Sequence, residues 1–268
     1  MNKKFQQLEM ISKVKELSQA DLNISANMMY GSFTKGEGDQ FSDIEFYIFL
    51  NDDKKFDSLN WVKQICPVLM FFKNEYGTEV AIFDNLIRGE FHFLPKSEIN
   101  IIKSWEGLVS FEHEDEMILV DKEGLLSGIF TKIATKIPER RTEANIQWLS
   151  QSLLNSLLLT GNLLKRGELA HAHNSFNSLQ KYILWLFRLR EDSTRHWESP
   201  TKSLEQSISP DAYKEYKSIA PELEERSLLA AYMQAINISK KLFIDLNVEE
   251  SLNNVLESID RRETSKSS

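Results

Sequence analysis

Asp43 and Glu45 stand at the start of an apolar run that ends at Leu50. Strand side chains alternate between the two faces of a sheet, so the even-numbered residues of the run form an apolar face and the two acids share the opposite one. Two carboxylates on one face repel each other, and a divalent cation removes that repulsion. Hard oxygen ligands of this kind suit Mg2+, which binds substrate phosphates at the same time. The pair is therefore a candidate metal site, and the alternative is an ordinary strand end in solvent.

A Gly-Ser pair closes the preceding apolar run, Ile24 to Tyr30, which we expect to be a strand. Glycine lets the backbone approach a phosphate closely, and a serine after it can donate to a phosphate oxygen beside free backbone N–H groups. Taken alone, Gly31 and Ser32 would indicate only a turn. Together with Asp43 and Glu45 on the next strand, they predict a phosphate-binding turn beside a metal site, which is the apparatus of phosphoryl or nucleotidyl transfer.

The order Gly-Ser, ten residues, then Asp-x-Glu within an apolar strand resembles the signature of the polymerase-beta-like nucleotidyltransferases. Over its whole length, the chain is most similar to the lincosamide nucleotidyltransferases of antibiotic-resistant bacteria. The resemblance implies ATP as nucleotide donor, two Mg2+ ions, and Asp43 and Glu45 as catalytic residues and metal ligands, with Gly31 and Ser32 binding the nucleotide. It also implies a mixed sheet with flanking helices and a third carboxylate from a later strand.

Glu90 is the best candidate for that third carboxylate, which would deprotonate an attacking hydroxyl. On the expected strand from Ile87 to Leu94, the apolar side chains share one face, while Arg88, Glu90 and His92 share the other. Gly89, beside Glu90, would let a substrate approach the backbone. The resembling antibiotic-modifying enzymes carry a catalytic-base glutamate on the corresponding strand.

Two alternatives for Glu90 stay open at this point. It could be a solvent-facing strand residue paired with Arg88, or it could be a metal ligand instead of the base. Glu79 and Asp84 are the acids to consider if Glu90 is not the base.

A polar stripe follows the expected helix from residue 168 to 190. His173, Asn177, Lys181 and Arg188 recur at four- and seven-residue spacing and would line one side of the helix. A triphosphate needs cations and donors around it, so we assign nucleotide binding to Asn177 and Lys181. The alternative is a solvated helix face. His171 and His173 are two residues apart and would point away from each other on a helix, so they are not a metal pair.

The chain changes character near its middle. Strand signals vanish from Lys122 onward and helical periodicity takes over, with Pro138 at the expected boundary. We therefore predict an α+β nucleotidyltransferase domain at residues 1–135 and an all-α helical-bundle domain at 136–268. Ser199-Pro200 and Ser209-Pro210 each have the pattern of a helix start. The expected strands are 24–30, 44–50, 67–72, 78–83, 87–94 and 117–120, and the expected helices are 5–17, 56–65, 96–105, 143–165, 168–190, 222–246 and 252–259.

Composition narrows the function classes. The net charge is -8, with Lys and Arg scattered through the 268 residues, which argues against a nucleic-acid partner and permits a small cationic substrate. No apolar run has the length of a membrane helix and no signal peptide is evident, so we expect no membrane partner. Cys66 is the single cysteine, which excludes an intrachain disulfide and favours the cytoplasm. Trp105, Trp148, Trp185 and Trp197 are expected in the core.

These observations predict an antibiotic-inactivating adenylyltransferase that moves AMP from ATP to a sugar hydroxyl of a lincosamide and releases pyrophosphate. An aminoglycoside nucleotidyltransferase is one alternative, and only the drug pocket would separate the two. A nucleotide-binding module of the toxin–antitoxin kind is another, although the intact Gly31, Ser32, Asp43 and Glu45 favour catalysis. Because related enzymes often pair so that both subunits border the drug site, we also expect a homodimer.

Overall fold

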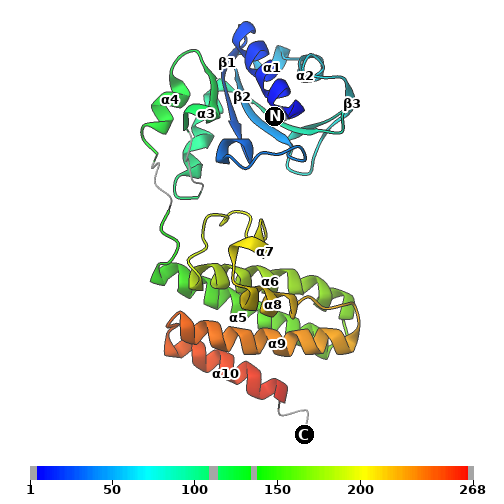
Figure 1. Ribbon diagram of the computed structural model, residues 1–268, viewed down its shortest axis with the longest axis vertical. Helices are drawn as coiled ribbons and strands as arrows, with labels where there is room; N and C mark the ends of the chain where they lie inside the picture. The colour runs from blue at the N-terminus through cyan, green and yellow to red at the C-terminus, as the bar shows by residue number, and fades with distance from the viewer. Residues whose placement is uncertain (1–4, 109–113, 134–137, 265–268) are drawn as a thin grey trace. The chain divides into compact units, whose positions relative to one another are not determined.

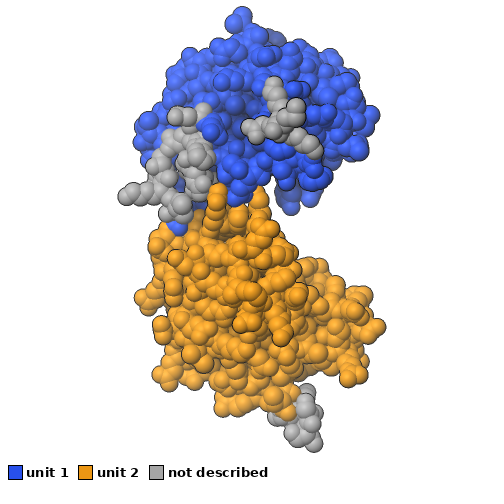
Figure 2. Space-filling view, in the orientation of Figure 1, with its two compact units in different colours: residues 1–138 blue, residues 139–268 orange. Residues whose placement is uncertain are grey.

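The computed structural model describes residues 5–108, 114–133 and 138–264. The chain divides into two compact units, residues 1–138 and residues 139–268, which Figure 2 distinguishes by colour. The expected boundary between residues 135 and 136 lies outside the described residues.

The first unit is built on one mixed sheet. Among the described residues its order is β3-β4-β5-β2-β1-β6, and β1, β2 and β3 are labelled in Figure 1. Strands β2 and β5 are parallel, and the other neighbouring pairs are antiparallel. The strands are β1 (Ile24–Tyr30), β2 (Ile44–Leu50), β3 (Val68–Lys73), β4 (Glu79–Phe83), β5 (Arg88–Pro95) and β6 (Ile118–Asp121). This mixed sheet confirms the fold class expected for the N-terminal half.

Helices cover both faces of the sheet. Helix α1 (Gln6–Ala20) buries Val14 against the face that carries Phe46 and Phe91. The opposite face carries Met28 and Phe49 and packs against η3 and α4. The covering and connecting elements are η1 (Phe33–Lys35), η2 (Asp53–Lys55), α2 (Ser58–Val62), η3 (Lys96–Trp105), α3 (Glu114–Met117) and α4 (Leu125–Phe130).

The segment Lys96–Trp105 is a 3-10 helix, so the expected helix is present with a tighter winding. Ile99 and Ile102 are buried and Trp105 is half-buried against the same core. Their spacing of three matches the three residues per turn of a 3-10 helix, which places all three on one face. An α-helix would rotate them progressively away from the sheet.

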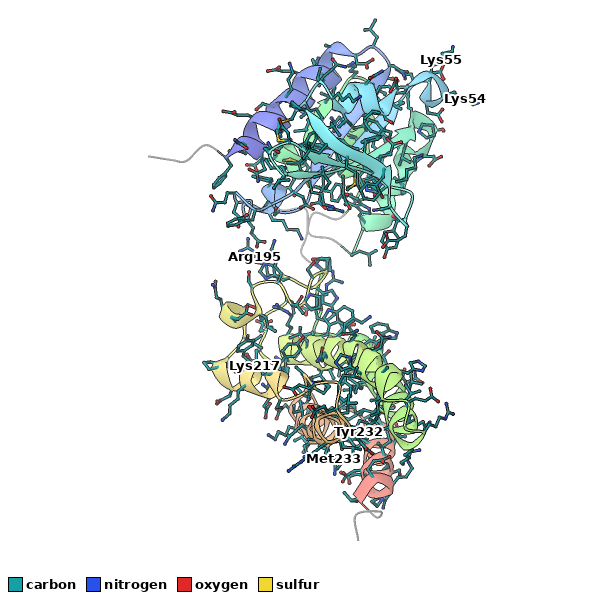
Figure 3. All side chains as sticks on the ribbon, turned by 90° about the vertical axis from the view of Figure 1, so that its right-hand side faces the viewer. Lys54, Lys55, Arg195, Lys217, Tyr232 and Met233 are labelled. Carbon is teal, nitrogen blue, oxygen red and sulfur yellow. The ribbon has the colours of Figure 1, made fainter. Side chains whose placement is uncertain are left out.

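The second unit is helical. Helices α5 (Glu143–Lys165), α6 (Leu169–Arg190), α9 (Glu225–Asp245) and α10 (Glu250–Thr264) pack around one core, and the short α7 (Leu204–Ser207) and α8 (Pro210–Lys217) connect α6 to α9. Tyr232 on α9, labelled in Figure 3, is buried, and its hydroxyl donates to the Leu157 carbonyl at 3.0 Å. A Cβ at Gly161 would meet that hydroxyl, so a glycine on α5 admits the ring. The all-α class expected for this half is confirmed.

The two expected Ser-Pro helix starts have different outcomes. Ser209 caps α8, and its Oγ accepts from the Ala212 N–H at 3.2 Å. Ser199-Pro200 starts no helix, and residues 191–203 consist of turns, bends and irregular backbone. The Pro200 carbonyl instead accepts a hydrogen bond from the buried Arg188 side chain at 2.8 Å. Across the described residues, no helix combines the length and apolar character of a membrane span.

Candidate active site

The Gly31-Ser32 turn follows β1 directly, as the sequence predicted. Gly31 has φ +87°, a conformation that residues with a side chain rarely adopt. A Cβ at this position would overlap the Glu45 carboxylate, which therefore lies against the bare backbone of the turn. Tyr30 pairs with Glu45 across β1 and β2, which brings the turn and this acid together.

Ser32 follows in a helical conformation and directly precedes η1. Its carbonyl accepts hydrogen bonds from the N–H groups of Lys35 and Glu37. The buried Oγ of Ser32 has no hydrogen-bond partner among the residues that the structure describes. Buried hydroxyls normally have a partner, so this orphaned group suits a phosphate oxygen at the turn.

Glu45 and Glu90 lie directly opposite each other on the parallel strands β2 and β5. This register places carboxylates from two strands that are distant in sequence on one face of the sheet. Asp43 lies just before β2 and is engaged by a residue of β5, Arg88. The structure therefore gathers Asp43, Glu45 and Glu90 at one region, beside Gly31.

Arg88 bridges two of these acids. One guanidinium nitrogen donates to Asp43 Oδ2 at 2.7 Å, and the other donates to Glu90 Oε1. The side chains of Asp43, Arg88 and Glu90 are 36%, 41% and 18% exposed, so the cluster is in contact with solvent. Burial opposes the charge on Arg88, but the hydrogen bonds and negative charges of Glu90 and Asp43 raise its pKa overall.

An aromatic group lies beside Glu90. The rings of Tyr47 and His92 stack with centroids 4.1 Å apart, and Tyr30 and Trp105 flank them. Tyr30 Oη lies 3.0 Å from His92 Nε2 and 3.4 Å from Glu90 Oε2. Burial and the charges of Glu45 and Glu90 raise the pKa of Tyr30, so its hydroxyl keeps its proton. Burial lowers the pKa of His92, with Glu90 opposing, so this ring favours the neutral form near pH 7.

A hollow of about 460 Å3 opens beside Asp43 and Arg88. Segments 40–43 and 85–88 line it, together with Gln7 of α1. Both charged side chains of the Asp43–Arg88 pair therefore face a space that solvent or a ligand can enter.

The residues fit a divalent cation by donor type. Asp43 and Glu45 provide hard oxygen ligands, and the orphaned Ser32 hydroxyl lies next to the turn that contacts Glu45. Within the described parts of the chain, no group of three or more His, Cys, Asp or Glu side chains is arranged to hold a metal ion. The Asp43 and Glu90 carboxylates are instead held by Arg88.

The two fallback acids lie elsewhere. Glu79 pairs with Phe91 across β4 and β5, which places it on the opposite face of the sheet from Glu90. It forms an ion pair with Lys73 at 3.6 Å. Asp84 accepts a hydrogen bond from Cys66 Sγ at 3.2 Å, and burial and this bond raise the pKa of the thiol to about 11.

Asn177 and Lys181 lie on α6 in the helical unit and are exposed. The Lys181 ammonium lies 5.1 Å from the Tyr182 ring centroid and 5.3 Å from that of Trp185. The prediction that Arg188 belongs to the polar stripe is wrong, because this side chain is fully buried and donates to backbone carbonyls. The nucleotide-binding role of Asn177 and Lys181 stays a prediction.

Sequence reasoning did not find two contacts of this site. Arg88 was considered as a partner of Glu90 alone, and its second partner Asp43 is 45 residues away in sequence. Tyr30 was treated only as the end of a strand, although it directly precedes the Gly-Ser pair. Its position next to Gly31 was the available signal, but contact with Glu90 depends on strands that are not adjacent in sequence.

Comparison with known protein families finds a match in the helical half. Residues 142–262 match the family described as "Lincosamide nucleotidyltransferase-like, C-terminal domain". The match lies in the helical half and covers less than half of the chain, and it supports the resemblance to the lincosamide nucleotidyltransferases there. No curated protein matches the chain.

Solved structures with similarity to the chain include two from bacteria. One is an aminoglycoside 6-adenyltransferase from Bacillus subtilis, at 14% identity and TM-score 0.44 over 98% of both chains. Another is a nucleotidyltransferase-like protein from Exiguobacterium sibiricum, at 13% identity and TM-score 0.39, covering 90% of this chain and 77% of that one.

Proposed function

We propose that this protein is an adenylyltransferase that transfers AMP from ATP to a sugar hydroxyl of a lincosamide antibiotic and releases pyrophosphate. The observation that carries the proposal is the pairing of Glu45 with Glu90 across β2 and β5, beside the Gly31-Ser32 turn. The lincosamide as acceptor is supported by the family match of residues 142–262.

The nucleotide is proposed to bind at the Gly31-Ser32 turn. Gly31 has no side chain between its backbone and the Glu45 carboxylate, and the buried Ser32 Oγ is a donor available to a phosphate oxygen. Asn177 and Lys181 are proposed as further nucleotide-binding residues because they offer an amide and an ammonium on an exposed helix face.

Two Mg2+ ions, held by Asp43 and Glu45, would supply positive charge against the triphosphate. Glu90 is proposed to accept the proton of the acceptor hydroxyl on its carboxylate. The hydroxyl oxygen then bonds to the α-phosphorus as the bond to the bridging oxygen breaks and pyrophosphate leaves. The protonated Tyr30 hydroxyl, 3.4 Å from Glu90 Oε2, orients that carboxylate.

We further propose a cytoplasmic homodimer whose substrates are a nucleoside triphosphate and a small antibiotic, with no nucleic acid or membrane partner. The acidic net charge of -8 and the single cysteine support this setting. Light scattering at micromolar concentration checks the dimer, and a monomer there would contradict it.

Mass spectrometry of a panel of antibiotics incubated with the protein, ATP and Mg2+ tests the activity. The panel contains lincomycin, clindamycin and several aminoglycosides, and an Asp43→Asn variant is the matched control. A mass gain of one AMP on a lincosamide, absent with the variant, is the expected result. A mass gain on aminoglycosides alone would show that the acceptor is an aminoglycoside and not a lincosamide. No mass gain on any compound would overturn the proposed transfer.

A further inference from the structure

Arg88 is the point where the charges of the candidate site meet. It begins β5 on the face shared with Glu90, and its guanidinium donates to carboxylates from two separate segments. One partner, Asp43, is a proposed metal ligand, and the other, Glu90, is the proposed base. A single cation therefore holds two acids that the proposed reaction requires in other roles.

We propose that Arg88 is a resident counter-cation of this site, which a divalent metal displaces from Asp43 and which then binds the phosphates of the nucleotide. The proposal rests on the proposed function, because it assigns a further nucleotide-binding residue to the same site. Arg88 thereby couples metal binding to nucleotide binding.

Arg88 and a metal ion compete for the same carboxylate. Neighbouring carboxylates repel each other, and a cation between them removes that repulsion. Arg88 satisfies this need with two ion pairs in the described structure. A metal ion that takes Asp43 has to displace this contact, so Arg88 opposes metal binding to the free protein.

The guanidinium released from Asp43 needs new acceptors, and a phosphate can provide them. Its planar group of donors suits the paired oxygens of a phosphate as well as those of a carboxylate. The side chain is 41% exposed and borders the hollow beside Asp43, so it can exchange partners without leaving a buried charge unpaired. The nucleotide then provides new acceptors when the metal has taken the old one.

These two roles of Arg88 predict effects of opposite sign for one substitution. Arg88→Met removes the charge, so the free protein should bind Mn2+ about tenfold more tightly, because one competing charged contact is gone. The same variant should bind ATP about tenfold more weakly, because a charge-assisted phosphate contact is lost. Isothermal titration calorimetry measures both affinities, with Mn2+ alone first and ATP in the presence of Mn2+ second. A role limited to holding β5 in place would weaken both.

Lys73→Met is the matched control, because it removes a cation that pairs with Glu79 at 3.6 Å in the same sheet. It should change neither affinity. Adding Asp43→Asn to Arg88→Met should abolish the gain in Mn2+ affinity, which locates the gain at the carboxylate that Arg88 releases.

An unchanged or weaker Mn2+ affinity in Arg88→Met would overturn the proposal. Circular dichroism checks that the variant is folded. If it is not, Arg88→Lys decides, since an ammonium keeps the charge but lacks the fork that reaches both acids. Arg88→Lys should gain Mn2+ affinity by a smaller factor, and no gain would count against the proposal. Failure of the wild-type protein to modify any antibiotic would refute the proposed function. The Mn2+ affinities of wild type and Arg88→Met would still test whether Arg88 competes with a metal for Asp43.

Discussion

Arg88 in the sheet unit and Arg188 in the helical unit present the same chemical group in opposite settings. Arg88 is 41% exposed and binds two carboxylates. Arg188 is fully buried and donates to the carbonyls of Ser193, Pro200 and Lys202 at 2.8–3.0 Å. Burial lowers the pKa of Arg188, whereas the carboxylates raise that of Arg88 in spite of burial.

The difference separates a cation that fixes shape from one that can change partners. Releasing Arg188 would leave several buried polar groups without hydrogen bonds, which is costly. The ion pairs of Arg88 are near solvent, where a single pair contributes little to stability. The charged cluster of the sheet unit is thus free to serve ligand binding, while Arg188 holds the connection between α6 and α7.

Asp43→Asn should have the largest effect, a fall in AMP transfer of about 10^4-fold or more with the fold intact, because a proposed metal ligand loses its charge. Pyrophosphate release at saturating Mg2+ measures the rate, and Glu45→Gln should behave alike. Turnover comparable to wild type in either variant would contradict the assignment of the two acids as metal ligands.

Glu90→Gln should lower kcat by a factor of ~10^2 to 10^4, because a positioned base is lost, while ATP and drug affinity stay nearly normal. Stopped-flow kinetics and calorimetry on one variant give both quantities. Loss of Mg2+-dependent ATP binding would make Glu90 a metal ligand instead. A kcat within a few fold of wild type would remove it from the mechanism.

Arg188→Met should lower the free energy of unfolding of the helical unit by about 2–4 kcal/mol, since buried carbonyls lose charged donors. Arg88→Met should change stability by less than about 1 kcal/mol in the absence of ligands. Urea unfolding followed by circular dichroism compares the two variants. Equal losses would erase the distinction between the two arginines.

Ser32→Ala should have the smallest effect. ATP affinity should fall by about tenfold, because one hydroxyl contact to a phosphate is lost, and drug affinity should hold. The unfolding free energy should not fall, because the buried Oγ has no partner among the described residues. Unchanged ATP affinity in calorimetry would mean that Gly31-Ser32 is only a turn and does not bind phosphate.

Local apolar patterns were sufficient to predict the elements that carry the site. The strand Ile24–Tyr30 and the helix Glu143–Lys165 have the predicted bounds because their apolar residues recur at strand and helix spacing. The pairing of Glu45 with Glu90 could not be predicted in the same way. It depends on parallel strands separated by a hairpin, and no local pattern specifies which strands become neighbours.

The failures lie where tertiary contacts override the spacing of residues. Arg188 has the spacing of a polar stripe, but the loop after α6 wraps around its guanidinium and buries it. Trp148 was expected in the core and is 52% exposed, with its ring near those of Tyr182 and Trp185. The composition of a helix does not show which of its aromatic residues a neighbouring segment will cover.

The parallel alignment of β2 and β5 also affects how the chain tolerates changes in length. The hairpin of β3 and β4 connects these strands in sequence but lies on the outer side of β5 in the sheet. Its turn at 74–77 has local hydrogen bonds to Asn74 and lies outside the β2–β5 pair, so we expect extra residues there to leave the register of Glu45 and Glu90 unchanged. The turn is consequently a suitable insertion point for a fluorescent reporter or an affinity tag.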